Sequence, residues 1–109
     1  MAYDEKLADR IRAVLVAHNG LTEMRMFGGI AFMLRGNMCC GLVKDDLMIR
    51  VGREQYEKLL AEPHGRPMEF TGRPMRGFVY VGPDGYRSDR ALAKWVERGV
   101  DFAASLPPK

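Results

Sequence analysis

Residues 30–43 read IAFMLRGNMCCGLV, and this stretch decides the fold. Two apolar runs, 30–34 and 38–43, flank the short segment Arg35, Gly36 and Asn37. A Gly-Asn pair between apolar runs is a tight-turn signal, and so short a connection joins only antiparallel neighbours. The stretch therefore predicts an antiparallel β-hairpin.

The hairpin continues into a larger sheet on both sides. A polar turn follows it, and residues 47–51 predict the next strand. Upstream, Gly28-Gly29 is interpreted as a bulge or bend within one long first strand, since paired glycines relieve the backbone there. Residues 68–70 and 75–81 predict two more strands. We therefore expect an antiparallel sheet of about five strands.

Three amphipathic segments predict helices. Residues 4–18 repeat apolar side chains at helical spacing, with Asp4 as the N-cap. Residues 53–62 form a second such segment, and Ser88 caps the third. The order helix, three strands, helix, two strands, helix predicts a single α+β domain over residues 1–109. The core should include Leu7, Ile11, Leu15, Phe32, Ile49, Phe78 and Trp95.

The composition excludes several classes of protein. With 109 residues, 47% hydrophobic and 28% charged, the chain can bury one hydrophobic core and is not disordered. The net charge of +3 is far below that of a dense basic stripe, and no recognition helix is evident, so we expect no strong direct DNA binding. No apolar run approaches the length of a membrane span or a signal peptide. We expect a cytoplasmic protein without membrane contact.

Cys39 and Cys40 are the two cysteines of the chain. Adjacent Cα atoms lie about 3.8 Å apart, below the usual disulfide range of about 4.4–6.8 Å, so we expect free thiols. On a strand the two side chains should point to opposite faces. A reactive thiol or half of a metal site is one interpretation. Packing in the core is favoured, because free cysteine is often buried and neither histidine has ligand spacing with the thiols. We expect no metal and no other cofactor.

Arg66, Arg73 and Arg76 lie close together in a segment with glycine turns. Guanidinium groups bind carboxylates and phosphates in bidentate pairs, so one hypothesis is a contact with an anion or an acidic partner. The favoured alternative is a set of ordinary surface ion pairs with nearby acids, namely Glu69, Asp84 and Asp89.

Methionines are concentrated in the first strands of the predicted sheet. Five of the eight are Met24, Met26, Met33, Met38 and Met48. Residues 30–34 are apolar at every position, whereas a sheet with one wet face would alternate apolar and polar residues. Either helices cover both faces, or the second face is an interaction surface for a partner protein or a second copy of the chain. Methionine-rich surfaces suit partner binding because the side chain is adaptable, but methionine buried in a core is commoner.

Several blocks of the sequence resemble the N-terminal domain of the TfoX/Sxy family. They are MFGGIAFM at 26–33, GNMCCG at 36–41, FTGRPM at 70–75, GFV at 77–79 and Trp95-Val96. The resemblance covers essentially the whole chain and implies the same order of helices and strands around an antiparallel sheet. It also implies a bacterial cytoplasmic protein tied to control of competence genes, whose best-known members help a cyclic-AMP-responsive activator at unusual promoters. Those regulators carry a second, C-terminal helical domain, and we expect this chain to be a stand-alone N-terminal domain. The family offers no catalytic residues to carry over.

Two functions follow as hypotheses. The favoured one is a non-enzymatic regulatory module that acts through protein contacts, with a transcription regulator as partner. The alternative is a small ligand-binding protein or thiol-dependent enzyme that uses Cys39 or Cys40 with the arginines of segment 66–76. A flat apolar sheet face would favour the first hypothesis, and a concave pocket holding a perturbed thiol would favour the second.

Overall fold

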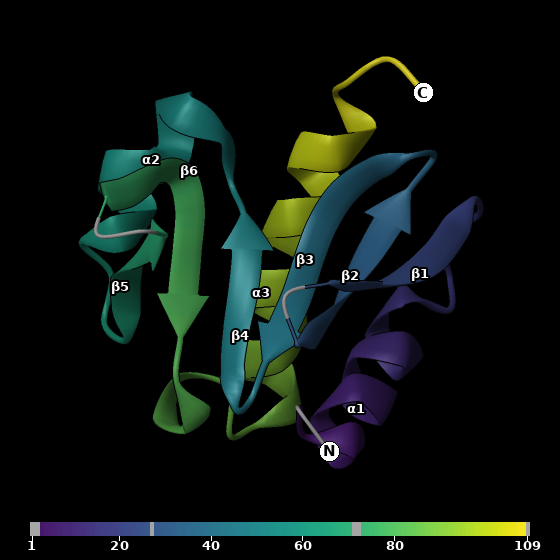
Figure 1. The fold of residues 1–109 in the computed structure, drawn as a ribbon, viewed down its shortest axis with the longest axis horizontal. Helices are drawn as coiled ribbons and strands as arrows, with labels where there is room; N and C mark the ends of the chain where they lie inside the picture. Colours follow the sequence, from purple (N-terminus) through teal and green to yellow (C-terminus); the bar gives the residue numbers. More distant parts are fainter. Residues whose placement is uncertain (1–2, 27, 71–72, 109) are drawn as a thin grey trace.

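The chain forms one antiparallel sheet with helices packed on it (Figure 1). The computed structural model describes residues 3–26, 28–70 and 73–108. Its elements are α1 (Glu5–Leu15), β1 (Leu21–Met26), β2 (Gly29–Leu34), β3 (Asn37–Val43), β4 (Asp46–Arg50), α2 (Gly52–Leu60), β5 (Gly65–Phe70), β6 (Arg73–Val81), the 3-10 turn η1 (Pro83–Gly85) and α3 (Asp89–Ala104). The strand order is β1-β2-β3-β4-β6-β5, and every neighbouring pair is antiparallel. The predicted α+β class and antiparallel sheet are confirmed.

The sheet has six strands because residues 21–34 fold back on themselves. The interpretation of Gly28-Gly29 as a bulge or bend in one long strand is wrong. β1 and β2 pair along their whole length, from Leu21↔Leu34 to Met26↔Gly29, and Gly28 has a φ of 74°. Glycine adopts positive φ without a steric cost, which a tight hairpin turn requires. Gly28 therefore lies in the turn that reverses the chain, and Gly29 begins β2.

The predicted helix caps are confirmed. The Asp4 carboxylate accepts the backbone N–H groups of Lys6 at 3.0 Å and Leu7 at 3.2 Å. The Ser88 hydroxyl accepts the N–H of Ala91 at 3.1 Å. Each bond satisfies an N–H that has no partner within its helix, so the caps fix where α1 and α3 begin.

The core lies between the sheet and the helices. In Figure 1, α3 is drawn behind β3 and β4, which it contacts, while α1 packs on α3 and α2 packs on β5 and β6. Every second residue of β4 and β6 faces the helices and is fully buried, namely Leu47, Ile49, Val79 and Val81. The other predicted core residues are buried as expected, except for Phe78. Phe78 is half-buried because Val79 takes the inward position next to it.

One close contact fixes the distance between α3 and the sheet. A Cβ atom added to Gly99 would lie 2.1 Å from the carbonyl oxygen of Cys39, which no real side chain tolerates. Glycine at this position therefore lets the α3 backbone rest directly on β3. Within the described ranges, no helix has the length and apolar character needed to cross a membrane.

Candidate protein-interaction surface

The side of the sheet turned away from α3 carries a row of residues that crosses all six strands. In the order of the strands, the row consists of Met24, Ala31, Gly41, Met48, Tyr80 and Arg66, each the register partner of the next. We call this side the open face. Alternation along the strands adds Met33, Asp46 and Phe78 to it, and Met38 joins them as the register partner of Met33. Because α3 lies behind the sheet in Figure 1, the open face is the one turned toward the viewer.

Methionine side chains cover the middle of the open face. A Cβ atom on Gly41 would lie 2.6 Å from Met48 Cε and 3.3 Å from Met38 Cε, so both thioether side chains lie over this glycine. Ala31 and Met48 are buried, and Met24 is 51% exposed. Of the two alternatives that the sequence left open, the one with helices over both faces does not hold for the described residues: methionines of the sheet itself shield its second side.

Arg66 lies at the edge of the open face and is part of an ion pair. Its Nη2 lies 2.5 Å from Asp46 Oδ1, and its guanidinium lies 5.7 Å from the centroid of the Tyr80 ring. The surface-pair interpretation thus holds for Arg66, but with a partner that the sequence did not indicate. Of the acids expected to take this role, Asp84 pairs with Arg87 and Asp89 pairs with Arg10.

The structure describes the other two arginines of the segment, Arg73 and Arg76, in less detail. Arg76 is exposed on β6. Arg73 begins β6, but its side chain lies outside the described part of the structure, as does that of Glu69. A further arginine that sequence reasoning missed, Arg50, lies over the rings of Phe78 at 5.9 Å and Phe102 at 5.1 Å. No sequence signal indicated it, because the two rings come from distant parts of the chain.

Cys39 and Cys40 are both fully buried among core residues. Their sulfur atoms lie 3.9 Å apart, and the Cys39 thiol donates to the carbonyl oxygen of Phe32 at 3.3 Å. The prediction that they point to opposite faces is wrong. The β2–β3 register shifts between Phe32 and Met33, so Cys39 is an extra residue in a bulge, and a bulge interrupts the alternation of side chains.

The two thiols perturb each other. Their shared hydrogen bond and complete burial raise the pKa of Cys40 well above its ordinary value. The same hydrogen bond lowers the pKa of Cys39. Two clefts of the described structure, one between α2 and α3 and one between α1 and β1, have no cysteine in their lining. Among the described residues, no three His, Cys, Asp or Glu side chains gather as metal ligands. The thiols and Arg66 are not brought together, because Arg66 lies on the open face and the thiols lie in the core.

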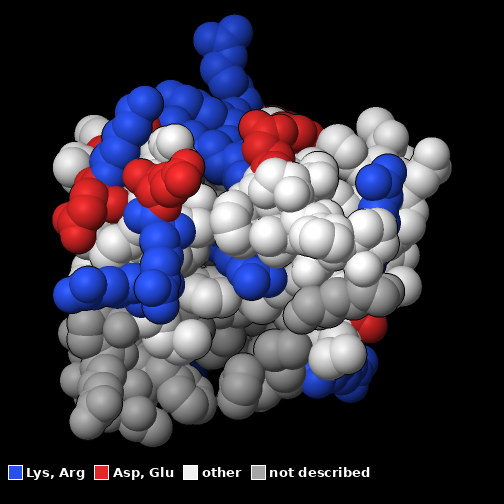
Figure 2. Space-filling model, turned by 90° about the horizontal axis from the view of Figure 1, so that it is seen from above, with Lys and Arg blue, Asp and Glu red and all other residues white. Residues whose placement is uncertain are grey.

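Charges of both signs are mixed at one end of the molecule. Figure 2 shows Lys and Arg gathered over one side of this view, with Asp and Glu side chains among them. Much of the rest of this view is uncharged. This end therefore presents no continuous basic stripe of the kind that follows a phosphate backbone.

The model of the TfoX N-terminal domain family matches residues 14–103, a span that contains the complete sheet and α2. The chain belongs to the TfoX N-terminal domain family. The resemblance seen in the sequence is thereby confirmed. No curated protein and no solved structure gives a significant match. The whole row from Met24 to Arg66 lies inside the matched span, so the open face is part of this TfoX domain.

Proposed function

We propose that this TfoX N-terminal domain is a non-enzymatic regulatory module whose open face binds an acidic protein partner. One observation carries the proposal: a single row on the helix-free side joins Met24 and Met48 to Arg66. The methionine-rich and arginine-rich segments, which lie far apart in the sequence, thus contribute to the same surface. Adaptable apolar side chains beside arginine form the combination that is enriched in protein interfaces.

The partner we propose is a transcription regulator with an acidic patch around an apolar side chain. The family resemblance implies a role in competence control beside a cyclic-AMP-responsive activator, and such a role needs a protein contact. Charge complementarity supports the acidic patch, since the chain carries +3 and Arg66 of the open face can exchange Asp46 for a carboxylate of the partner. Met24, which is 51% exposed, supplies an apolar anchor that a partner could bury.

The same proposal holds that the domain does not read DNA sequence directly. A few arginines give nonspecific affinity that falls steeply with salt, whereas specific readers present side chains to base edges. The domain would then act on promoters only through the regulator that it contacts.

The test compares two glutamate substitutions at exposed apolar residues. Met24→Glu places a negative charge on the open face, where an acidic partner would be repelled, and Val16→Glu makes the matched change at a residue that is 81% exposed just beyond α1. We expect Met24→Glu to weaken binding to the purified cyclic-AMP-responsive activator of the same host at least tenfold, and Val16→Glu to change it less than twofold. Titration calorimetry measures the affinity, and circular dichroism checks that both variants fold.

Three results would overturn the proposal. One is the absence of binding to that activator by the unsubstituted domain. Another is equal weakening by the two glutamate substitutions. The third is nanomolar binding of the domain to one DNA sequence over scrambled DNA at physiological salt.

A further inference from the structure

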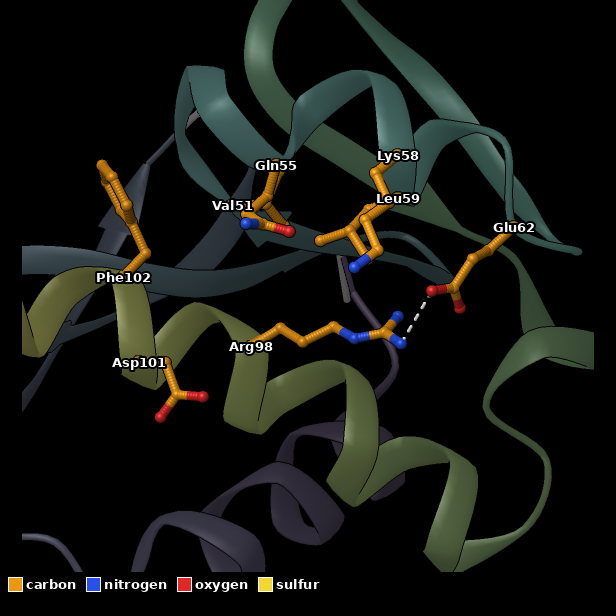
Figure 3. Close-up of a pocket in the computed structure, with 8 residues that line it drawn as sticks. All are labelled: Val51, Gln55, Lys58, Leu59, Glu62, Arg98, Asp101 and Phe102. Carbon is orange, nitrogen blue, oxygen red and sulfur yellow. Dashed lines mark hydrogen bonds and ion pairs between the residues drawn. The ribbon is translucent and has the colours of Figure 1, made fainter.

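A cleft of about 450 Å³ separates α2 from α3, on the side of the sheet that the helices cover (Figure 3). Its apolar lining includes Val51, Leu59 and Phe102. Its volume falls within the range of small-molecule sites, which are concave and mostly apolar with a few polar groups. In Figure 3 the Arg98 side chain extends from α3 into the space below α2, with its guanidinium toward Glu62.

Only part of the hydrogen-bonding capacity of the Arg98 guanidinium is used in this cleft. Its Nη2 donates to Glu62 Oε2 at 2.8 Å, and its guanidinium lies 4.7 Å from the centroid of the Trp95 ring. Nη1, by contrast, is buried and has no hydrogen-bond partner in the described structure. A buried donor without an acceptor is costly, more so on a charged group, and such a group in a native fold indicates a missing partner.

We infer that the α2–α3 cleft binds a small monocarboxylate with an apolar tail. The carboxylate accepts from Arg98 Nη1, because an ionised acceptor is the strongest partner for guanidinium. The tail packs against Leu59 and Phe102. Because Nη1 is buried, the ligand reaches it by displacing lining side chains, and Lys58 is exposed and free to move.

The charges around Arg98 select a singly charged ligand. Glu62 and Asp101 line the same cleft and would repel a second negative charge, as on a phosphate monoester. Lys58 adds one cation, which together with Arg98 balances the two acids, so a bound monocarboxylate leaves a net charge of −1 and a dianion would leave −2. This cleft is on the other side of the sheet from the open face. A failure to bind the carboxylate would therefore not contradict the proposed protein contact, and a failure of the protein contact would not contradict carboxylate binding.

The test uses 3-phenylpropionate as the probe, with its neutral amide, 3-phenylpropionamide, as the matched control. Trp95 is the single tryptophan of the chain and lies against Arg98, so its fluorescence reports on the site. We expect a saturable fluorescence change with a Kd on the order of 1 mM, as for a ligand of this size. The methyl resonances of Val51 and Leu59 should shift with the same Kd, and the amide should bind at least tenfold more weakly.

Three substitutions sharpen the test. Arg98→Met keeps the apolar stem and should abolish binding, whereas Arg76→Met, at an exposed arginine of β6, should leave it unchanged. Glu62→Gln keeps an acceptor for Nη2 but removes a repelling charge, so it should tighten binding about threefold. If Arg98→Met fails to fold, the affinity of the Glu62→Gln variant for the probe still tests the inference. Equal binding of acid and amide, no binding of the acid at 50 mM, or weaker binding to the Glu62→Gln variant would each overturn the inference.

Discussion

The two faces of the sheet are both apolar, but they are shielded from water in different ways. On the helix side, leucine, isoleucine and valine side chains are fully buried under α1 and α3, and the α3 backbone rests on β3 at Gly99. On the open face, Met38 and Met48 lie over Gly41, and Figure 1 draws none of the described helices in front of β3 and β4. One side depends on a rigid fit of backbones, and the other depends on flexible side chains that a partner can displace. Stability should therefore respond most strongly to changes on the helix side.

Two glycine substitutions give the largest contrast between the faces. In Gly99→Ala the new Cβ meets the backbone oxygen of Cys39 at 2.1 Å, so α3 must move away from the sheet. We expect a loss of about 2–3 kcal/mol in the free energy of unfolding, despite the better helix propensity of alanine. In Gly41→Ala the nearest atom is the mobile end of Met48, although the Ile30 oxygen at 2.9 Å limits the space. A loss of about 1 kcal/mol is expected there.

Urea unfolding of both glycine variants measures this contrast. Each is compared with the unsubstituted chain at the same pH and protein concentration. Equal losses for the two variants would show that the open face is packed as rigidly as the helix side.

The contrast between the faces could be predicted only in part from sequence. The hairpin around Gly36 was predictable because its turn and both apolar runs are local. The turn residues, however, are Arg35 and Gly36, whereas Asn37, which was expected in the turn, already pairs with Leu34. The β1–β2 hairpin was not, because the residues of β1 that face the helices include the charged Glu23. Its carboxylate pairs with Arg12 of α1 at 2.7 Å, a contact that local patterns cannot show. A strand with a charged inner face does not match the usual alternation.

The candidate sites show the same limit. The cysteines could be assigned to the core from residue type, but their shared side of the strand depends on a bulge set by pairing with β2. Arg66 was singled out for its neighbours in sequence, whereas its actual partner is Asp46 in another strand. Arg98 and Glu62 are 36 residues apart, and only the packing of α2 near α3 joins them. Local sequence indicates which residue types are present and not which ones meet.

The buried thiols predict a moderate effect of pH on the helix side. As the pH rises above about 8.5, both cysteines of an unfolded chain lose their protons. In the folded chain the pKa of Cys39 is lowered, so Cys39 loses its proton first. The pKa of Cys40 is raised, so Cys40 keeps its proton in this pH range. The unfolded state then binds fewer protons, so the free energy of unfolding should fall, by about 1 kcal/mol between pH 8.5 and 10.

A double variant isolates the contribution of the thiols. Cys39→Ala with Cys40→Ala should fold, with lower stability at neutral pH, and should lack this part of the pH dependence. Other groups that titrate at high pH, such as Tyr86 with a pKa raised to about 12, affect both proteins alike. Urea unfolding at several pH values, under reducing conditions, measures the difference. Parallel pH profiles for the two proteins would contradict the assignment.

The smallest effect is expected for the ion pair at the edge of the open face. Arg66 and Asp46 have side chains that are 51% and 33% exposed, so water screens their attraction although the atoms lie 2.5 Å apart. A double-mutant cycle with Arg66→Ala and Asp46→Ala should give a coupling of about 0.2–1 kcal/mol, which should shrink further in 1 M salt. A coupling above about 2 kcal/mol would show that the pair is structural and is not available to a partner. The weak coupling expected here is what a binding surface requires, because a partner carboxylate can then replace Asp46 on Arg66 at little cost to the fold.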